Sequence, residues 1–456
     1  MRIRIARIMF VACLGLFGAF PARPETTETT AYPSLQAAID ANPGKVVYVP
    51  PGDYVIDKAL RITEDNTGLC GYGRVIQIDP AEHIVEIWRA GAEVAGVRIV
   101  NLTLTRTDGA QETHCHGILA NNCVDLDITG VRVIDNWSNA GNIRLQQCRT
   151  SSVRGCTVTN YKRIAVDDRT ESDLYGYAFR VIDGTGILVT QSTGIMVQEN
   201  RVVERRLFPT QDVKDRHQLG QFTDGKRPMK KGPLAPRGTY ANNWHQGSAI
   251  VVTSPEETDQ ILVTGNYIEN AAQGIDIHAD HLTCSQNVIK YAFIGIKCMH
   301  GARNVIISGN NISHYDLWGI VMIPGTASHP AEAATEEHAA RGANYTRGNI
   351  IANNILSDFG FGHEYYNWVE GTGRAISLES GQLPENPIMA DVLIQGNIVY
   401  DTCKEGVLEN GVPVAGTPRY EFAVYITPEP RPQNLHFANN IFHPGSEGVS
   451  NLPLTP

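Results

Sequence analysis

The sequence has few residues that could hold a chain together by covalent or metal links. It contains nine cysteines among 456 residues, and no two of them form a Cys-x-x-Cys pair. A structural zinc site is therefore not expected, and a chain of this length can build a large core without a dense disulfide framework. With 42% hydrophobic and 19% charged residues, the composition is that of an ordinary folded protein rather than a disordered one.

Long apolar runs and helical repeats are also scarce. No extended helical periodicity follows residue 45, and the main apolar run, IMFVACLGLFGAF, lies at the N-terminus behind the basic segment MRIRIAR. This order is typical of a secretory signal rather than a membrane span. We therefore expect residues 1–22 to be a signal peptide, with an approximate cleavage point. Residues 23–456 would then be a secreted or periplasmic domain with no contact to the membrane.

An asparagine-containing phrase recurs through the second half of the chain. The first steps between copies are 21 and 23 residues, and the later steps of 43, 44 and 42 residues are close to twice that length. Between the copies lie short β-branched runs such as QGIDIH and IGIKCM. Short strands with this period predict an all-β, single-domain right-handed parallel β-helix, in which each strand pairs with its copy one coil away. The copies are VTGNYIEN, CSQNVIKY, ISGNNISH, IIANNILSD, IQGNIVYD and FANNIFHP, at or near Asn266, Asn287, Asn310, Asn353, Asn397 and Asn439.

These asparagines are expected to be structural. An amide at a corner tolerates left-handed backbone and can hydrogen-bond its neighbours above and below.

The segment YPSLQAAIDANPGKVVYVPPGDYVI begins the repeats. Ser34 is a suitable N-cap for a short amphipathic helix through Ile39, which would cover the open end of the solenoid. This segment resembles the opening of the pectate-lyase-like β-helix proteins, and the coils that follow are similar to their repeats over most of residues 32–445. The resemblance implies the fold but leaves the activity open. The superfamily includes polysaccharide lyases, uronate epimerases, glycoside hydrolases, fructan-cleaving transferases and phage tailspikes.

The candidate site lies on the strand that contains GIDIH. Alternate residues of a strand face opposite sides, so its two isoleucines are expected in the core. Asp276 and His278 should then face solvent. Alignment of the next coil on its glycine places Lys297 beside Asp276 and His300 just beyond. The coil before, NWHQGSAIV, is expected to place Ala249 beside Asp276.

Two arginines extend this row toward the N-terminus. GNIRLQ supplies Arg144, YAFRVI supplies Arg180, and His245 is expected at the strand entrance. A row of cationic and imidazole side chains indicates a groove for an extended anionic polysaccharide or oligosaccharide, with Arg144, Arg180 and His300 binding it. The alternative is that these outward positions are charged only because they are exposed to water.

The coil rhythm breaks in a long insertion at residues 205–245. From 205 to 237 it contains nine Lys or Arg against three Asp. Because the insertion returns to the strands one coil before Asp276, we expect a basic flap in which Lys230, Lys231 and Arg237 bind substrate. Nucleic acid is not expected as a partner, because an acidic exported protein with no aromatic interleaving here is a poor match for it. A solvated loop without function is the alternative.

Cleavage of a uronate polymer by β-elimination needs a cation on the carboxylate, a base for the C5 proton and an acid for the leaving oxygen. The row offers all three, so a polysaccharide lyase is the function we expect. The candidates are Lys297 with Arg180 or Arg237 as cations, His245 or His278 as base, and Tyr240 as acid, with Asp276 beside them.

Other activities of the same fold stay open. A uronate C5-epimerase shares the first two steps, and a carbohydrate-binding solenoid needs no chemistry. Asp167 and Asp168 resemble the adjacent aspartates of polygalacturonate hydrolases, but the next coil lacks the histidine of that signature. A fructan-type transferase could use Asp276 with Glu379, which is otherwise assigned to substrate binding.

Metal binding is not assigned from the sequence. The oxygens of Asp276 and Asp280 suit Ca²⁺, which prefers oxygen ligands. His278 and His281 would point to different sides of an extended segment and make a poor imidazole pair. The run THCHG at residues 113–117 also resembles a metal motif, but it lies in the N-terminal coils and is expected to be structural.

Overall fold

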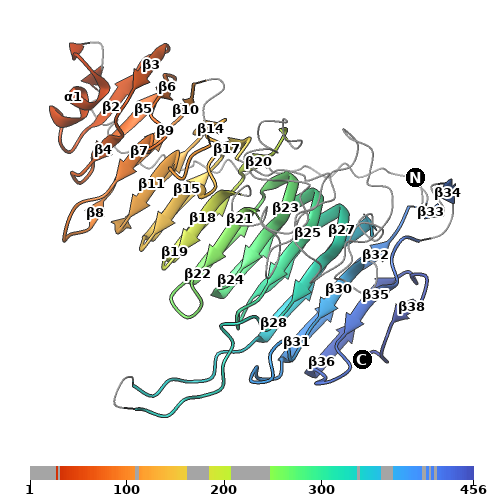
Figure 1. The fold of residues 1–456 in the computed structure, drawn as a ribbon. Helices are drawn as coiled ribbons and strands as arrows, with labels where there is room; N and C mark the ends of the chain where they lie inside the picture. The colour runs from red at the N-terminus through yellow and green to blue at the C-terminus, as the bar shows by residue number, and fades with distance from the viewer. Residues whose placement is uncertain are drawn as a thin grey trace, which may run out of the picture.

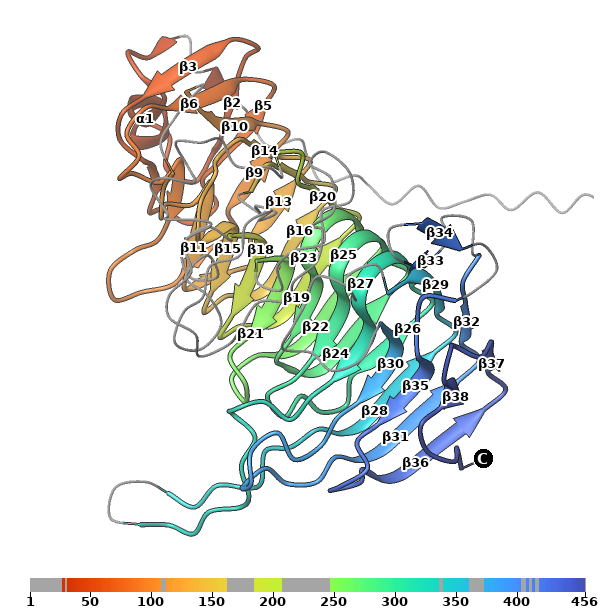
Figure 2. The same ribbon diagram turned by 45° about the vertical axis from the view of Figure 1, so that its right-hand side comes forward.

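The computed structural model describes residues 27–28, 31–107, 112–161, 184–206, 247–335, 339–360, 373–402, 407–409, 412–414 and 418–455, and the structural statements below concern these residues. They form a right-handed parallel β-helix with one short helix, as the repeats predicted. The coils stack from the end that carries α1 (Leu35–Asp40) to the end that carries β36 and β38 (Figures 1 and 2).

Two large parallel sheets build the solenoid. The 15-stranded sheet contains β1 Thr27–Glu28, β2 Val46–Val49, β5 Gly68–Gly71, β8 Val94–Ala95, β9 Arg98–Val100, β12 Cys123–Val124, β13 Asp127–Thr129, β16 Arg149–Arg154, β19 Thr193–Gln198, β22 Asp259–Thr264, β24 Asp280–Ser285, β26 Ile306–Ser308, β28 Arg347–Ala352, β31 Ala390–Gln395 and β36 Gln433–Ala438. The 21-stranded sheet contains β3 Asp53–Ile56, β4 Leu60–Ile62, β6 Arg74–Gln77, β7 Val85–Ile87, β10 Thr103–Arg106, β11 Ile118–Asn121, β14 Arg132–Ile134, β15 Gly141–Gln146, β17 Thr157–Thr159, β18 Thr185–Thr190, β20 Arg201–Val203, β21 Ser248–Thr253, β23 Tyr267–Ile277, β25 Val288–Cys298, β27 Asn311–Met322, β29 Ile355–Phe359, β30 Arg374–Leu378, β32 Ile398–Tyr400, β35 Phe422–Ile426, β37 Ile441–Phe442 and β38 Gly448–Ser450. A separate antiparallel pair joins β33 Val407–Glu409 to β34 Val412–Val414.

The larger sheet has two columns of strands. The long strands β23, β25 and β27 run through both columns. β23 and β27 each pair with one short strand in the first half and another in the second, and β25 pairs with both of them along its length. We call the second column the site column. It consists of β4, β7, β11, β15, β18, β21, the C-terminal halves of β23, β25 and β27, and then β30, β35 and β38.

The core follows from the alternation of side chains in this register. In the site column Ile250, Ile275, Ile296, Ile320 and Ile376 are consecutive partners, and each is fully buried. Because every coil repeats this inward position, one continuous apolar core runs along the solenoid from α1 to the last coils.

The repeated asparagines form a buried ladder of side-chain hydrogen bonds. The amide of Asn287, for example, donates to Oδ1 of Asn310 at 2.9 Å, and the amide of Asn310 donates to Oδ1 of Asn354 at 2.9 Å. The predicted hydrogen bonding is therefore confirmed. The left-handed backbone, however, belongs to the residue before each ladder asparagine, as at Gly309 and Asn353, with φ of 65° and 56°.

The helix α1 covers the first coil. Ser34 caps it, since its hydroxyl accepts a hydrogen bond from the backbone N–H of Ala37 at 3.1 Å. Leu35, Ala38 and Ile39 are buried against the end of the core. The predicted capping helix is thus present, and it covers apolar residues that the first coil would otherwise expose.

Two other expectations concern the insertion and the cysteines. Residues 207–245 of the predicted insertion lie outside the described residues. The seven cysteines in the described part have free thiols, and the five that are buried fill core positions. These residues contain no disulfide framework, in line with the expectation from sequence. No helix among the described residues is long and apolar enough to span a membrane.

Candidate active site on the outer face of the site column

The candidate site begins with two charged residues on neighbouring strands. Asp276 of β23 and Lys297 of β25 are direct partners, as alignment on the glycines predicted. The coil before supplies Val251 at this position and not Ala249, so the predicted register of that coil was wrong by two residues. Val321 follows Lys297 on β27.

The carboxylate of Asp276 contacts the ammonium group of Lys297 and the imidazole ring of His278. Its Oδ2 lies 3.1 Å from Nζ of Lys297, and its Oδ1 lies 2.8 Å from Nε2 of His278. Burial raises the pKa of a carboxyl group, but the charges of His278 and Lys297 outweigh burial here and lower the pKa of Asp276 to about 2. The carboxylate is therefore ionised at any ordinary pH.

The expectation that Asp276 and His278 are exposed to solvent was wrong. Only 7% of the Asp276 side chain, 9% of Lys297 and 11% of His278 are accessible. They point away from the core, but Val251 and Val321 border the charged pair along its own row. Alternation correctly gave the face of the sheet on which these side chains lie, but it does not report what covers that face.

An outer apolar cluster lies just beyond the pair. Phe293, Ile294, Leu317, Val321 and Ile323 form it, and partly buried Met299 and Trp318 pack against it. Charges beside such a surface are weakly screened, which strengthens their interactions.

His278 has a polar neighbour at each ring nitrogen. Its Nδ1 lies 3.0 Å from the hydroxyl of Thr253 on β21, and its Nε2 faces Asp276. The sequence gave no indication of Thr253, because a threonine in a strand is ordinary. Only the register brings it next to His278.

His300 completes the cluster. Its ring lies edge-on to the ring of His278, with centroids 4.6 Å apart. The Nδ1 atom of His300 accepts a hydrogen bond from the backbone N–H of Ala327 at 3.3 Å. Burial and the nearby charges of His278 and Lys297 lower the pKa of His300 to about 4, so its ring is neutral at neutral pH.

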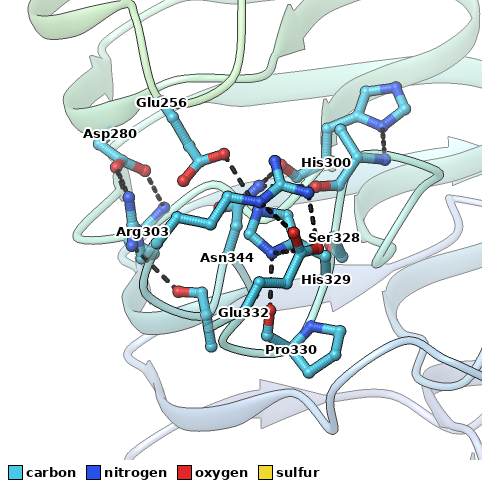
Figure 3. A network of polar contacts seen from close by, with 12 residues as sticks. Glu256, Asp280, His300, Arg303, Ser328, His329, Pro330, Glu332 and Asn344 are labelled. Atoms are coloured by element: carbon cyan, nitrogen blue, oxygen red, sulfur yellow. Dashed lines mark hydrogen bonds and ion pairs between the residues drawn. The ribbon is translucent and has the colours of Figure 1, made fainter. Parts of the chain in front are cut away.

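The loop between β27 and β28 holds His300 in place. Asn344 donates hydrogen bonds to the carbonyl oxygens of His300 and Ala327, at 3.0 and 2.8 Å. His329, on the same loop, lies 3.2 Å from Glu256 of the β21–β22 connection (Figure 3). These contacts hold the loop against two different coils and so keep Ala327 beside His300.

The other predicted residues are more dispersed. Arg144 of β15 does lie in the same row, but Leu188 and Val251 separate it from Asp276 by three strand steps, roughly 14 Å. The row position next to Arg144 belongs to Leu188 and not to Arg180, because the strand that pairs there is β18.

Glu379 lies three strand steps beyond His278, after β30. Its carboxylate accepts a hydrogen bond from Ser377 at 2.9 Å and lies 3.7 Å from Arg374. Burial raises the pKa of Glu379, although Arg374 partly opposes this. The guanidinium of Arg374 stacks on the ring of Tyr425 at 3.4 Å, a contact that no motif in the sequence indicated.

The suggested calcium ligands do not come together. Asp280 belongs to β24 of the other sheet, where it binds Arg303 through the side chain and the backbone (Figure 3). Asp276 is occupied by Lys297 and His278. Within the described ranges, no group of three or more His, Cys, Asp or Glu side chains is arranged to hold a metal ion.

Several predicted residues lie outside the described residues. They are the candidate catalytic residues Tyr240 and His245, the candidate substrate-binding residues Arg180, Lys230, Lys231 and Arg237, and the aspartates Asp167 and Asp168.

Comparison with solved structures agrees with the fold. The tailspike protein of E. coli bacteriophage HK620, in complex with a pentasaccharide, aligns over 92% of this chain with a TM-score of 0.54 and 12% identity. This chain spans only 62% of the tailspike. A family 28 exopolygalacturonase from Yersinia enterocolitica aligns over 94% of this chain and 78% of its own, with a TM-score of 0.52 and 10% identity. No protein-family model and no curated protein matches the sequence. At these identities the similarity establishes the parallel β-helix fold alone.

Proposed function

We propose that the protein binds an acidic polysaccharide on the outer face of the site column and cleaves it by β-elimination. The observation that carries the proposal is the joint placement of Asp276, His278, Lys297 and His300 at one point of that face. The two similar structures support a carbohydrate ligand, because one is bound to a pentasaccharide and the other is named as a polygalacturonase.

Lys297 has the role of neutralising the uronate carboxylate. Its ammonium group has three N–H donors, and Asp276 can take one of them. Withdrawal of negative charge from the uronate makes the C5 proton more acidic and stabilises the charge that develops when this proton leaves.

His278 has the role of general base. Because its Nε2 faces the carboxylate of Asp276, the neutral ring carries its proton there and leaves a lone pair on Nδ1. Rotation of the Thr253 hydroxyl frees Nδ1 to take the C5 proton. Asp276 keeps the ring oriented and stabilises the imidazolium that forms, as the carboxylate does in a catalytic triad.

His300 has the role of hydrogen-bond donor to the leaving oxygen. Its Nδ1 accepts from Ala327, so the neutral ring carries its proton on Nε2. A donor with a fixed position stabilises the charge that develops on the glycosidic oxygen as its bond to C4 breaks. The neutral ring does not itself give up this proton, so a separate acid must protonate the leaving oxygen, and Tyr240 is the candidate for it from sequence alone.

The carboxyl pair Asp276 and Glu379 does not suit hydrolysis. A glycosidase needs two carboxyl groups about 5 to 9.5 Å apart. Glu379 lies three strand steps from Asp276, and these steps alone amount to roughly 14 Å. The same spacing argues against this pair in a fructan-type transferase. An epimerase would use the same cation and base, so the reaction product must distinguish the two.

The test is to incubate the full chain with a panel of uronate polymers and to follow two signals together. A lyase produces reducing ends in step with the ultraviolet absorbance of an unsaturated uronate, and His278→Ala should slow both by about 10²- to 10⁴-fold. Reducing ends without that absorbance would indicate hydrolysis and refute the proposal. A change of uronate configuration in the NMR spectrum, without cleavage, would indicate an epimerase.

A further inference from the structure

A second polar region lies on the same face, three strands toward the N-terminus. It is centred on Arg144, which occupies the same outward row as Asp276. Its strand partners in that row are Leu119 and Leu188, both apolar. A guanidinium that projects between two leucines has no charged neighbour on either adjacent strand.

Arg144 is a half-buried cation without a partner. Within the described part of the chain it forms no hydrogen bond or ion pair, and its buried Nε is unpaired. The acid in its row is Glu86, two strands away, and Glu86 is bound to Arg61 at 3.1 Å. Burial lowers the pKa of Arg144, but an arginine stays charged in proteins. Such a charge costs free energy unless an anion pairs with it.

The surroundings of Arg144 do not oppose an anion. Its charge acts on two stacked histidines, His83 and His116, whose ring centroids are 5.0 Å apart. Burial lowers the pKa of both, that of His116 to about 4. Gly141 avoids a clash beside Arg144, because a Cβ there would lie 2.9 Å from Cβ of Leu188 and 3.5 Å from that of Arg144.

Other polar atoms nearby in the fold also lack partners. Oδ1 of Asn121, Nε1 of Trp137 and Oδ1 of Asn139 are buried and unpaired in the described structure. Asn121 is two residues after the strand partner of Arg144, and Trp137 and Asn139 lie in the connection that leads into β15. Unpaired buried polar atoms are rare, so four of them on two adjacent coils point to a missing polar ligand.

We infer that Arg144 is the centre of an anion-binding subsite that takes the carboxylate or sulfate group of an acidic sugar. A guanidinium suits both groups, because its planar N–H donors can bind two oxygens at once. A sugar hydroxyl would meet the unpaired Oδ1 of Asn121, whose strand partner Gln146 lies two residues after Arg144. Because the subsite lies roughly 14 Å from Asp276 along the strand stacking direction, one glycan chain that fills both sites must run along the axis of the solenoid.

This inference rests on the proposed acidic glycan, but it can be tested without cleavage. To avoid cleavage, every protein in the test is the full chain carrying His278→Ala. We would measure its Kd by calorimetry for uronate oligosaccharides of increasing length. Sulfated and neutral oligosaccharides of matched length distinguish the two anion sources. Arg144→Gln should raise Kd about tenfold to a hundredfold for long acidic chains. It should leave Kd unchanged for short chains that reach only the Asp276 cluster.

Two matched variants separate charge recognition from structure. Arg144→Lys keeps the charge but loses the planar donor pair, so we expect an intermediate Kd. Arg149→Gln removes an arginine of the other sheet that already has Glu93 as its carboxylate partner, at 2.8 Å, and it should not change Kd. An unchanged Kd for long acidic chains in Arg144→Gln, or an equal loss with neutral chains, would overturn the inference. If binding depends on Arg144 but the wild-type protein forms no unsaturated product, the inference stands and only the proposed β-elimination is refuted.

Discussion

Asp276 and Lys297 are direct partners on adjacent strands, and their charged groups lie 3.1 Å apart with less than a tenth of either side chain exposed. A pair in this position is costly to break, because removal of one member leaves the other as a buried charge. The site therefore contributes to stability as well as to the proposed chemistry, and variants must be assayed for both.

The first prediction separates these two contributions. Lys297→Met should lower the free energy of unfolding by about 3–5 kcal/mol, because Asp276 loses its ammonium partner. The double variant Asp276→Leu/Lys297→Met should recover most of this stability, since it leaves no uncompensated charge, and should stay inactive. Urea unfolding of the two single variants and the double variant gives the coupling energy. Strictly additive effects would mean that the pair is solvated in solution.

The second prediction concerns the proposed base. His278→Ala should reduce turnover by about 10²- to 10⁴-fold, the usual contribution of a general base. It should also cost some stability, because Asp276 and Thr253 each lose a contact. His281→Ala is the matched control. That histidine is 57% exposed and pairs with Asp259 on the other sheet, so activity should be preserved. Full activity of a folded His278→Ala variant would place the chemistry elsewhere.

The sequence was sufficient to predict the fold and the local partners of the site. The coil repeat and the alternation in GIDIH placed Lys297 beside Asp276, because a parallel β-helix aligns equivalent residues of successive coils. The same procedure failed where coils have different lengths. It placed Ala249 two residues out of register and assigned Arg180 a position that Leu188 holds.

The environment of the site could not be predicted from strand periodicity. Alternation states which face a side chain takes, but the burial of Asp276 also depends on groups packed over that face. Thr253 contacts His278, 25 positions later in the sequence, and Arg374 stacks on Tyr425, 51 positions later. Both contacts arise from side-chain geometry alone. Neither contact leaves a pattern in a single sequence.

The third prediction is a pH dependence of stability. His116 has a pKa of about 4 in the folded protein, mainly because it is buried, against 6.5 for an unperturbed histidine. As pH falls from 6.5 toward 4, the unfolded chain binds a proton that the folded chain does not. Stability should therefore fall over this window, by up to roughly 3 kcal/mol from His116, while above pH 6.5 its contribution is constant.

His116→Asn should reduce this loss, as measured by urea unfolding at pH 7 and at pH values near 5. The pH dependence of stability that remains should include the contribution of His300, whose pKa is also about 4. His281→Asn, at an exposed position, should leave the slope unchanged. A wild-type stability that does not change between pH 7 and pH 5 would contradict the burial of these rings.

The fourth prediction tests the basic insertion inferred from sequence. Lys230→Ala/Lys231→Ala should weaken the capture of a polyanionic substrate, seen as a higher KM with little change in kcat. The difference from wild type should shrink as salt rises, because ions screen the lost attraction. A deficit that does not depend on salt would point to a structural role for these lysines. A neutral glucan that is turned over as well as any uronate polymer would remove the electrostatic argument altogether.

The last prediction concerns the asparagine ladder, where two adjacent asparagines have opposite roles. Asn354 is fully buried: its amide donates to the carbonyl of Ile307 and to Oδ1 of Asn397, and its Oδ1 accepts from Asn310. Asn353 is exposed and takes the left-handed corner, with φ of 56°. Asn354→Ala leaves the carbonyl of Ile307 and two N–H groups of Asn310 without their side-chain partner, while Oδ1 of Asn397 still accepts from the backbone N–H of residue 354 at 3.0 Å. It should cost on the order of 4 kcal/mol, since each buried orphan costs about 1–3 kcal/mol. Asn353→Gly should change stability by no more than about 0.5 kcal/mol, because glycine adopts this backbone freely. Urea unfolding of both variants gives the comparison, and equal losses at the two positions would show that the ladder contributes no more than the corner.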